Sequence, residues 1–105
     1  MNNKLFHEIK KLNELNLVSY FRILGFKPVA EHEGATDYAV LLDNTDPTIL
    51  TIDHQTNRFQ DKIHNRGGTL VDFACLLFEC TSVELCSNIM PYKIDRLMSL
   101  TGNPT

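Results

Sequence analysis

Asp61 and His64 stand three residues apart in "DKIH", and both side chains are of types that bind zinc. A structural zinc site takes four protein ligands, and a catalytic site takes three ligands and a water. His54 is close enough in the sequence to be a third ligand, but the chain has no C-x-x-C or H-E-x-x-H pattern. We therefore expect no metal site, and we interpret Asp61 and His64 as solvated loop residues.

Basic residues recur at every fourth position over Arg58, Lys62 and Arg66, with Phe59 among them and His64 nearby. Such a surface suits single-stranded nucleic acid, because cations meet the phosphates while an aromatic ring stacks on a base. We predict a nucleic-acid-binding surface made of Arg58, Phe59, Lys62 and Arg66, with His64 at its periphery. An ordinary solvated strand and loop is the alternative.

The three cysteines, Cys75, Cys80 and Cys86, are five and six residues apart in an apolar stretch. An odd count without C-x-x-C indicates neither a disulfide framework nor a zinc knuckle. Reactive thiols occupy electropositive, partly exposed sites, so we interpret these cysteines as buried packing residues in a reducing, cytoplasmic setting. The acidic residues fall at turns and strand ends, where solvated carboxylates are common. We expect no catalytic residues and no enzyme activity of this chain on its own.

The length of 105 residues predicts a single domain over residues 1–105. Hydrophobic residues make up 43% of the chain, which is enough for a modest core. A net charge of −3 gives no overall attraction to a polyanion, so a nucleic acid would need a local basic patch. No apolar run is long enough to span a bilayer, and the N-terminal residues lack the apolar core of a secretory signal. We expect a soluble protein without membrane contact.

The spacing of apolar residues along the chain predicts the helices and strands that must position these residues. Apolar residues recur at three- and four-residue steps from Leu5 to Leu24, which predicts two helices separated at Asn16, the second ending at Gly25. Three runs rich in branched and aromatic residues follow: "DYAVLL", "TILTID" and the weaker "NRFQDKI". Turns at 33–34, 43–44 and 55–57 would join them into an antiparallel meander of three or four strands.

The chain becomes helical again after Gly67 and Gly68. Residues 70–78 are apolar around most of a helix, which predicts a central buried helix. Capping-box spacings begin this helix at Thr69 and a second, short helix over 82–89 at Thr81. Pro91 suits the first turn of a third helix that runs to about Leu100. We interpret the glycine pair as a tight strand-to-helix turn with close backbone contacts, and a phosphate-binding loop is the alternative. The fold class is therefore α+β.

Three segments resemble, in order and spacing, the primase-type zinc-binding domain of bacterial and mobile-element primases and toprim proteins. They are "LVSYFRILGFKPV", "DPTILTID" and "NRFQDKIHNRGGTLVDFACLLFECTSVEL", within residues 16–89. In that family a Thr-Pro-Ser-Phe strand entry precedes a strand ending in Cys-x-x-Cys, and a Gly-Gly turn opens a helix with Asp-Phe near its start. Here residues 46–49, Gly67-Gly68 and Asp72-Phe73 match these features.

The resemblance places the four zinc ligands of the family at Ala39, Leu42, Asp61 and His64, and the first two cannot bind a metal. It therefore implies a zinc-ribbon-like domain without zinc or any other cofactor, in which packing of Ala39 and Leu42 replaces the metal. It also implies an accessory domain that binds single-stranded DNA or positions template for a primase or toprim catalytic domain, in cis or in trans. The chain could be the N-terminal piece of such a protein. The alternative is a protein-docking module that has lost nucleic-acid binding.

Overall fold

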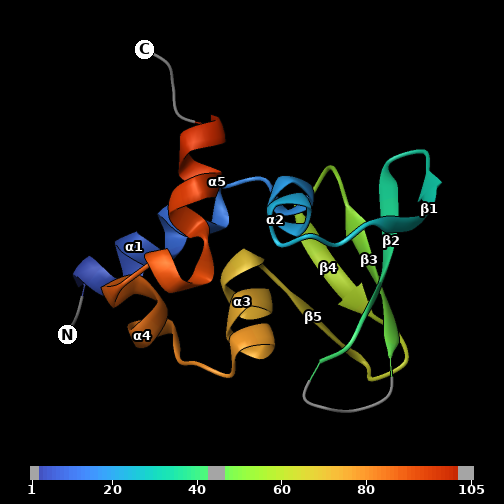
Figure 1. The fold of residues 1–105 in the computed structure, drawn as a ribbon. Coiled ribbons are helices and arrows are strands. Elements are labelled where there is room, and N and C mark those ends of the chain that lie inside the picture. The colour runs from blue at the N-terminus through green and yellow to red at the C-terminus, as the bar shows by residue number, and fades with distance from the viewer. Residues whose placement is uncertain (1–2, 43–46, 102–105) are drawn as a thin grey trace.

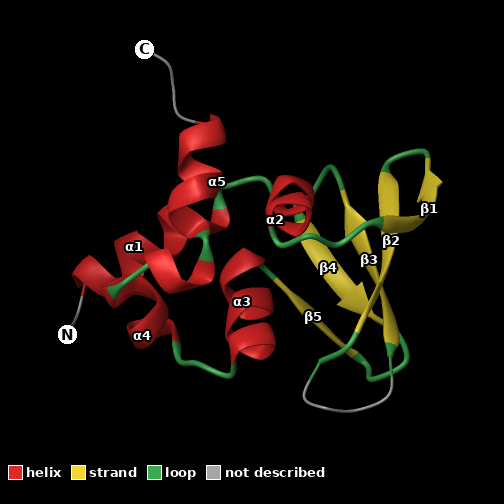
Figure 2. Cartoon of the chain, in the orientation of Figure 1, coloured by secondary structure: helices red, strands yellow, loops and turns green. Residues whose placement is uncertain are grey.

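Helices cover one face of an antiparallel sheet, and the other face is open (Figure 1). The structure is a computed structural model that describes residues 3–42 and 47–101. Figure 2 shows the helices gathered on one side of the molecule and the strands on the other. The predicted α+β class, with N-terminal and C-terminal helices packed beside a small meander, is confirmed.

The N-terminal residues form α1 (Asn3–Asn13) and α2 (Leu17–Ile23). They are separate helices because Asn16 is extended and its side chain accepts a hydrogen bond from the backbone N–H of Ser19 at 2.8 Å, which caps α2. Gly25 follows the end of α2 with a φ of +95°, a conformation that glycine adopts without steric cost. The predicted break and the predicted end of the second helix are both confirmed.

The sheet has five strands in the order β1-β2-β3-β4-β5, so every strand pairs with its neighbours in sequence. They are β1 (Pro28–His32), β2 (Ala35–Val40), β3 (Thr48–Asp53), β4 (Arg58–Asp61) and β5 (Arg66–Gly68). Three or four strands were predicted, and this number is wrong because the sheet has five. The three central strands and the turns at 33–34 and 55–57 were predicted, whereas β1 and β5 were not identified as strands. The predicted turn at 43–44 lies outside the described residues.

The C-terminal part contains α3 (Leu70–Phe78), α4 (Ser82–Ser87), a 3₁₀ turn over Met90–Tyr92 and α5 (Ile94–Thr101). Both predicted capping boxes, at Thr69 and at Thr81, are confirmed. The predicted start of the last helix at Pro91 is wrong, because Lys93 adopts a left-handed conformation that separates the 3₁₀ turn from α5. No helix in the described ranges is long and apolar enough to cross a membrane.

Gly67 and Gly68 lie in a strand, so their interpretation as a turn is wrong. Both belong to β5, and neither has a positive φ. The close backbone contact that was expected of them is present. A Cβ at Gly67 would stand 2.6 Å from the carbonyl oxygen of Phe59 in β4, and a Cβ at Gly68 would overlap the side chain of Asp72. The glycines are therefore required by close packing at the edge of the sheet.

Aromatic rings join the sheet to the helices in the core. Phe73 of α3 stacks on Phe21 of α2 with ring centroids 4.2 Å apart, and Phe59 of β4 meets Phe73 edge to face at 5.9 Å. Tyr38 of β2 lies against the same Phe21 ring at 4.6 Å. This cluster fixes which face of the sheet is buried, and the residues that alternate with it form the open face.

Candidate nucleic-acid interface

The open face of the sheet carries a hollow of about 530 Å³. Its lining comes from four strands and the turns between them, and charged, polar and small side chains predominate. The lining residues are Ala35, Thr51, Asp53, Thr56, Arg58, Phe59, Gln60, Lys62, Asn65, Arg66, Gly67 and Gly68. The hollow thus brings together all three basic residues of the predicted surface.

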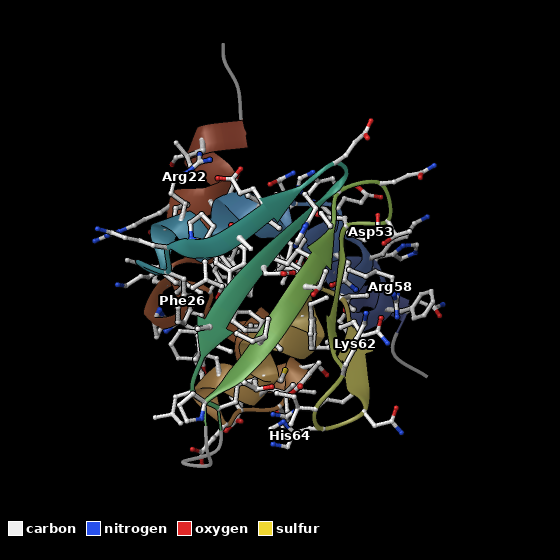
Figure 3. All side chains as sticks on the ribbon, turned by 90° about the vertical axis from the view of Figure 1, so that its right-hand side faces the viewer. Arg22, Phe26, Asp53, Arg58, Lys62 and His64 are labelled. Atoms are coloured by element: carbon white, nitrogen blue, oxygen red, sulfur yellow. The ribbon has the colours of Figure 1, made fainter. Side chains whose placement is uncertain are left out.

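Arg58 and Lys62 are the accessible cations of this hollow. Arg58 begins β4, Lys62 follows its last residue, and both side chains are exposed. Figure 3 shows the two residues on the same side of the sheet, between Asp53 and His64. Neither forms an ion pair with any residue in the described ranges. Lys62 is near enough to Asp37 to help lower the pKa of that carboxyl, but both cations stay exposed to an anionic ligand.

Phe59 corrects the predicted surface. Its side chain is only 3% exposed and packs in the core against Phe73, so it reaches the hollow from beneath and cannot stack on a base. Moving a phenylalanine ring from a core to solvent would cost about 1.5–3 kcal/mol. Phe26 does not take its place, because its ring packs against Phe21 and Phe73 and it lies near the opposite margin of the sheet (Figure 3).

Arg66 lies at the edge of the hollow and is partly committed to the protein itself. Its Nε donates a hydrogen bond to Oδ2 of Asp61 at 3.1 Å, and its side chain is 25% exposed. It therefore stabilises the sheet and also contributes positive charge to the hollow. Of the four predicted contact residues, the structure leaves Arg58 and Lys62 as the exposed ones.

Asp61 is fully buried, so its interpretation as a solvated residue is wrong. Oδ1 accepts hydrogen bonds from the Thr48 hydroxyl at 2.7 Å and from the backbone N–H of His64 at 3.2 Å. Oδ2 lies 2.9 Å from Nδ1 of His64 and accepts the bond from Arg66. The carboxylate thus links the first residue of β3, the last residue of β4, the following turn and β5.

These hydrogen bonds set the acidity of Asp61. Burial by itself raises the pKa, but the donors from Thr48, His64 and Arg66 outweigh it and lower the pKa to about 2. The group is consequently a carboxylate at neutral pH. Asp61 neutralises part of the charge of Arg66, so Arg58 and Lys62 supply most of the positive character of the hollow.

The two other positions at which the resemblance implied zinc ligands are not equivalent. Leu42 is buried in the core, as expected of a packing residue, whereas Ala39 is exposed on the open face. The prediction that both would pack in place of the metal is therefore wrong for Ala39. No group of three or more His, Cys, Asp or Glu side chains in the described part of the chain could hold a metal ion.

Two acidic residues share the open face with the cations, and both are engaged by protein donors. Asp37 meets Nε2 of His32 at 2.8 Å and accepts the Thr51 hydroxyl at 2.7 Å. These two hydrogen bonds hold the pKa of Asp37 below its ordinary value. Oδ1 of Asp53 accepts the backbone N–H groups of residues 55 and 56. Asp53 forms no ion pair with Arg58 among the described residues, although the two are paired in register.

Several residues of the hollow were not anticipated, namely Thr51, Gln60, Asn65 and Gly67. Thr51 is paired with Gln60, and Gln60 with Gly67, so they form one row across three strands. Gly67 adds no side chain to this row. Side chains alternate between the two faces of a strand, and this alternation through β3 and β4 could have identified Thr51 and Gln60.

The N-terminus of α3 is closed to an added anion. The side chain of Asp72 accepts hydrogen bonds from the backbone N–H of Thr69 at 2.9 Å and from its hydroxyl at 3.0 Å. The backbone N–H of Val71 donates to the side chain of Asn13. A phosphate beside the glycine pair would meet the Asp72 carboxylate, so this geometry disfavours the phosphate-loop alternative.

Comparisons of the chain with family models, with curated proteins and with solved structures find no match.

Proposed function

We propose that this chain is a zinc-free accessory domain of the primase type that binds single-stranded DNA on the open face of its sheet. The observation that supports this most directly is the pair Arg58 and Lys62, exposed at one hollow and without ion pairs among the described residues. In the same proposal the domain is cytoplasmic and positions template for a primase or toprim catalytic domain, in cis or in trans.

The proposed mode of binding is electrostatic. Because Phe59 is buried, no aromatic ring of the predicted surface is offered to a base, and the affinity rests on contacts between cations and phosphates. For single strands, the logarithm of the binding constant falls with the logarithm of salt by about 0.7 for each neutralised phosphate. Contacts from Arg58 and Lys62 alone would then give a slope near −1.4, as estimated from two such contacts.

The test is fluorescence anisotropy with labelled single-stranded oligonucleotides at low salt. We expect weak binding to the native protein with little dependence on base sequence. The double substitution Arg58→Ala with Lys62→Ala should lower the affinity by roughly tenfold or more, since a hydrogen bond to a charged group contributes about 1.5–3 kcal/mol. The salt dependence should flatten in parallel.

The control removes the same charge elsewhere: Lys10→Ala with Lys11→Ala in α1, both exposed and on the helical side of the molecule (Figure 1). These changes should leave binding almost unchanged. The absence of binding at high micromolar protein, or equal losses in the two double variants, would contradict the proposal.

A second candidate function is docking to a partner catalytic domain, and one observation favours it. Phe6 of α1 and Val83 of α4 are 71% and 54% exposed, and a hollow of about 390 Å³ between these helices is lined by Leu5, Val83 and Cys86 among others. Binding of DNA that is lost in the Arg58 and Lys62 variant favours the first function. If the native protein does not bind single-stranded DNA, docking is the better candidate.

A further inference from the structure

Helix α3 ends in a chain reversal that brings Cys80 back to Cys75. The carbonyl oxygen of Cys75 accepts hydrogen bonds from the backbone N–H of Glu79 and from that of Cys80, the second at 3.1 Å. Glu79 adopts the left-handed conformation, with φ of 53° and ψ of 51°. In this kind of helix end the side chains of the two residues joined by the longer hydrogen bond are frequently in contact, and here the side chains of Cys75 and Cys80 are hydrogen-bonded to each other.

The two thiols therefore lie side by side at the surface of the helical layer. Both residues are half-buried and line a hollow of about 520 Å³, together with Asp72 and Leu76. Burial, and after it the neighbouring Cys80 thiol, raise the pKa of Cys75 to about 12. A small oxidant can reach the pair through the hollow, and neither thiol has to leave the fold to meet the other.

We propose that Cys75 and Cys80 are a site of reversible oxidation, at which a small disulfide such as glutathione disulfide converts the two thiols into one intramolecular disulfide. Cys75 first loses its proton and attacks a sulfur of glutathione disulfide, which forms a mixed disulfide and releases one glutathione thiolate. Cys80 then loses its proton and attacks the Cys75 sulfur, which releases the second glutathione. Two protein thiols are oxidised, one glutathione disulfide is reduced, and the two protons end on the two glutathione thiols.

The surroundings of the two cysteines determine how strongly oxidising this disulfide is and how fast it forms. Disulfides are strong oxidants when the reduced form is stabilised as a thiolate, which is the opposite of the present case. Reduced Cys75 gains no such stabilisation from its surroundings, so its disulfide is not of this strongly oxidising kind. The same high pKa keeps the thiolate fraction small at neutral pH, and formation is therefore slow and accelerates as the pH rises.

Cys86 provides the matched control within the same chain. It is half-buried like the other two, but it lies on α4 in the hollow shared with Leu5 and Val83 of the α1–α4 groove. Burial, and then Glu8, raise its pKa. Cys86 therefore has a similar chemical environment, but no chain reversal holds it against either of the other cysteines.

The experiment treats the whole folded chain with glutathione disulfide, quenches with acid, and maps disulfides by mass spectrometry without reduction. A protease that cleaves after glutamate separates the three cysteines, because Glu79 lies between Cys75 and Cys80, and Glu84 between Cys80 and Cys86. We expect a disulfide between the peptides of Cys75 and Cys80, formed faster at higher pH. The native chain gives this result without any substitution.

Variants sharpen the result. Cys86→Ser should form the same disulfide at an unchanged rate, whereas Cys75→Ser and Cys80→Ser should stop at a mixed disulfide with glutathione. Circular dichroism establishes that each variant is folded. A dominant disulfide that includes Cys86, a dominant disulfide between two chains, or mixed disulfides alone in the native protein would overturn the proposal.

Discussion

A carboxylate without solvent contact needs hydrogen-bond donors, and Asp61 has them from three different parts of the chain: Thr48, His64 and Arg66. These donors cross-link the strands and the turn around Asp61, and Asp61 is the residue on which all of these bonds converge.

Asp61→Asn should destabilise the protein by about 2 kcal/mol, since a buried donor left unsatisfied costs about 1–3 kcal/mol. The amide nitrogen of asparagine would face N–H and O–H groups that now donate hydrogen bonds to the carboxylate. The measurement is chemical denaturation at neutral pH. Glu33→Gln, an exposed acid in the β1–β2 turn, is the control and should stay within about 0.5 kcal/mol of the native protein. An equally small change for Asp61→Asn would contradict the role given to this network.

The lowered pKa of Asp61 also predicts how the stability of the protein depends on pH. The pKa of Asp61 falls from 3.8, its ordinary value, to about 2 in the folded protein. A carboxyl group with a lowered pKa in the folded protein stabilises the fold fully when the pH is above its ordinary pKa. This stabilisation is lost as the pH falls toward the pKa of the folded protein. The native protein should therefore lose stability between about pH 5 and pH 2 more steeply than Asp61→Asn, as expected from this linkage. Parallel pH profiles of the two proteins would be incompatible with it.

At the scale of elements, β5 and α3 share a close contact at Gly68. Gly68→Ala should cost about 1–3 kcal/mol, because the added Cβ overlaps the side chain of Asp72. The cost should shrink, but not vanish, in the background of Asp72→Ala, which removes the carboxyl group and the cap but keeps the Cβ of residue 72, at 2.8 Å from the added Cβ. A double-mutant cycle by chemical denaturation measures this coupling. Gly67→Ala is the control, since its obstacle is the backbone oxygen of Phe59, and its cost should be the same in both backgrounds.

The elements that could be predicted are those with a local signal. Asn16, Thr69 and Thr81 mark helix starts by side chains that bond within three residues, and these starts are confirmed. β1 lacks the expected alternation because four of its five residues are exposed. β5 contains two glycines, which have low strand propensity, and its pairing with β4 depends on contacts that no local pattern encodes.

At the scale of the molecule, Asn57 ties the sheet to the helices. It lies in the β3–β4 turn with a φ of 59°, and its Oδ1 accepts the backbone N–H of Leu17 at 2.8 Å. Its Nδ2 donates to the carbonyl oxygens of Asn13 and Leu15 at 3.2 and 2.7 Å. One side chain thereby holds the connection between α1 and α2 against the sheet.

Asn57→Ala should destabilise by about 2–4 kcal/mol, from three hydrogen bonds of about 1 kcal/mol each and a left-handed conformation that alanine adopts at a cost. Asn57→Gly loses the same bonds but accommodates the positive φ, so thermal or chemical unfolding should find it about 1 kcal/mol more stable than the alanine variant. Equal stabilities of the two variants would show that the backbone conformation contributes nothing.

The candidate site was only partly predictable for a similar reason. Arg58 and Lys62 are four residues apart in an extended segment, so they share a face, and the hollow does contain both. Phe59 is adjacent to Arg58 and must point to the other face, a consequence of strand geometry that the basic-aromatic pattern overlooked. The commitment of Arg66 to Asp61 depends on the pairing of β4 with β5, which only the folded chain reveals.

The strand order β1-β2-β3-β4-β5 has a consequence for the kinetics of folding. Each strand pairs with the next one along the chain, so the sheet can form from successive hairpins without closing long loops. The helices differ, because α1 packs on α3 and α4, and α2 packs on α5. Closing those contacts joins the two ends of the chain. The sheet is therefore the part suited to form early, and docking of α1 and α5 is the step that completes the native structure.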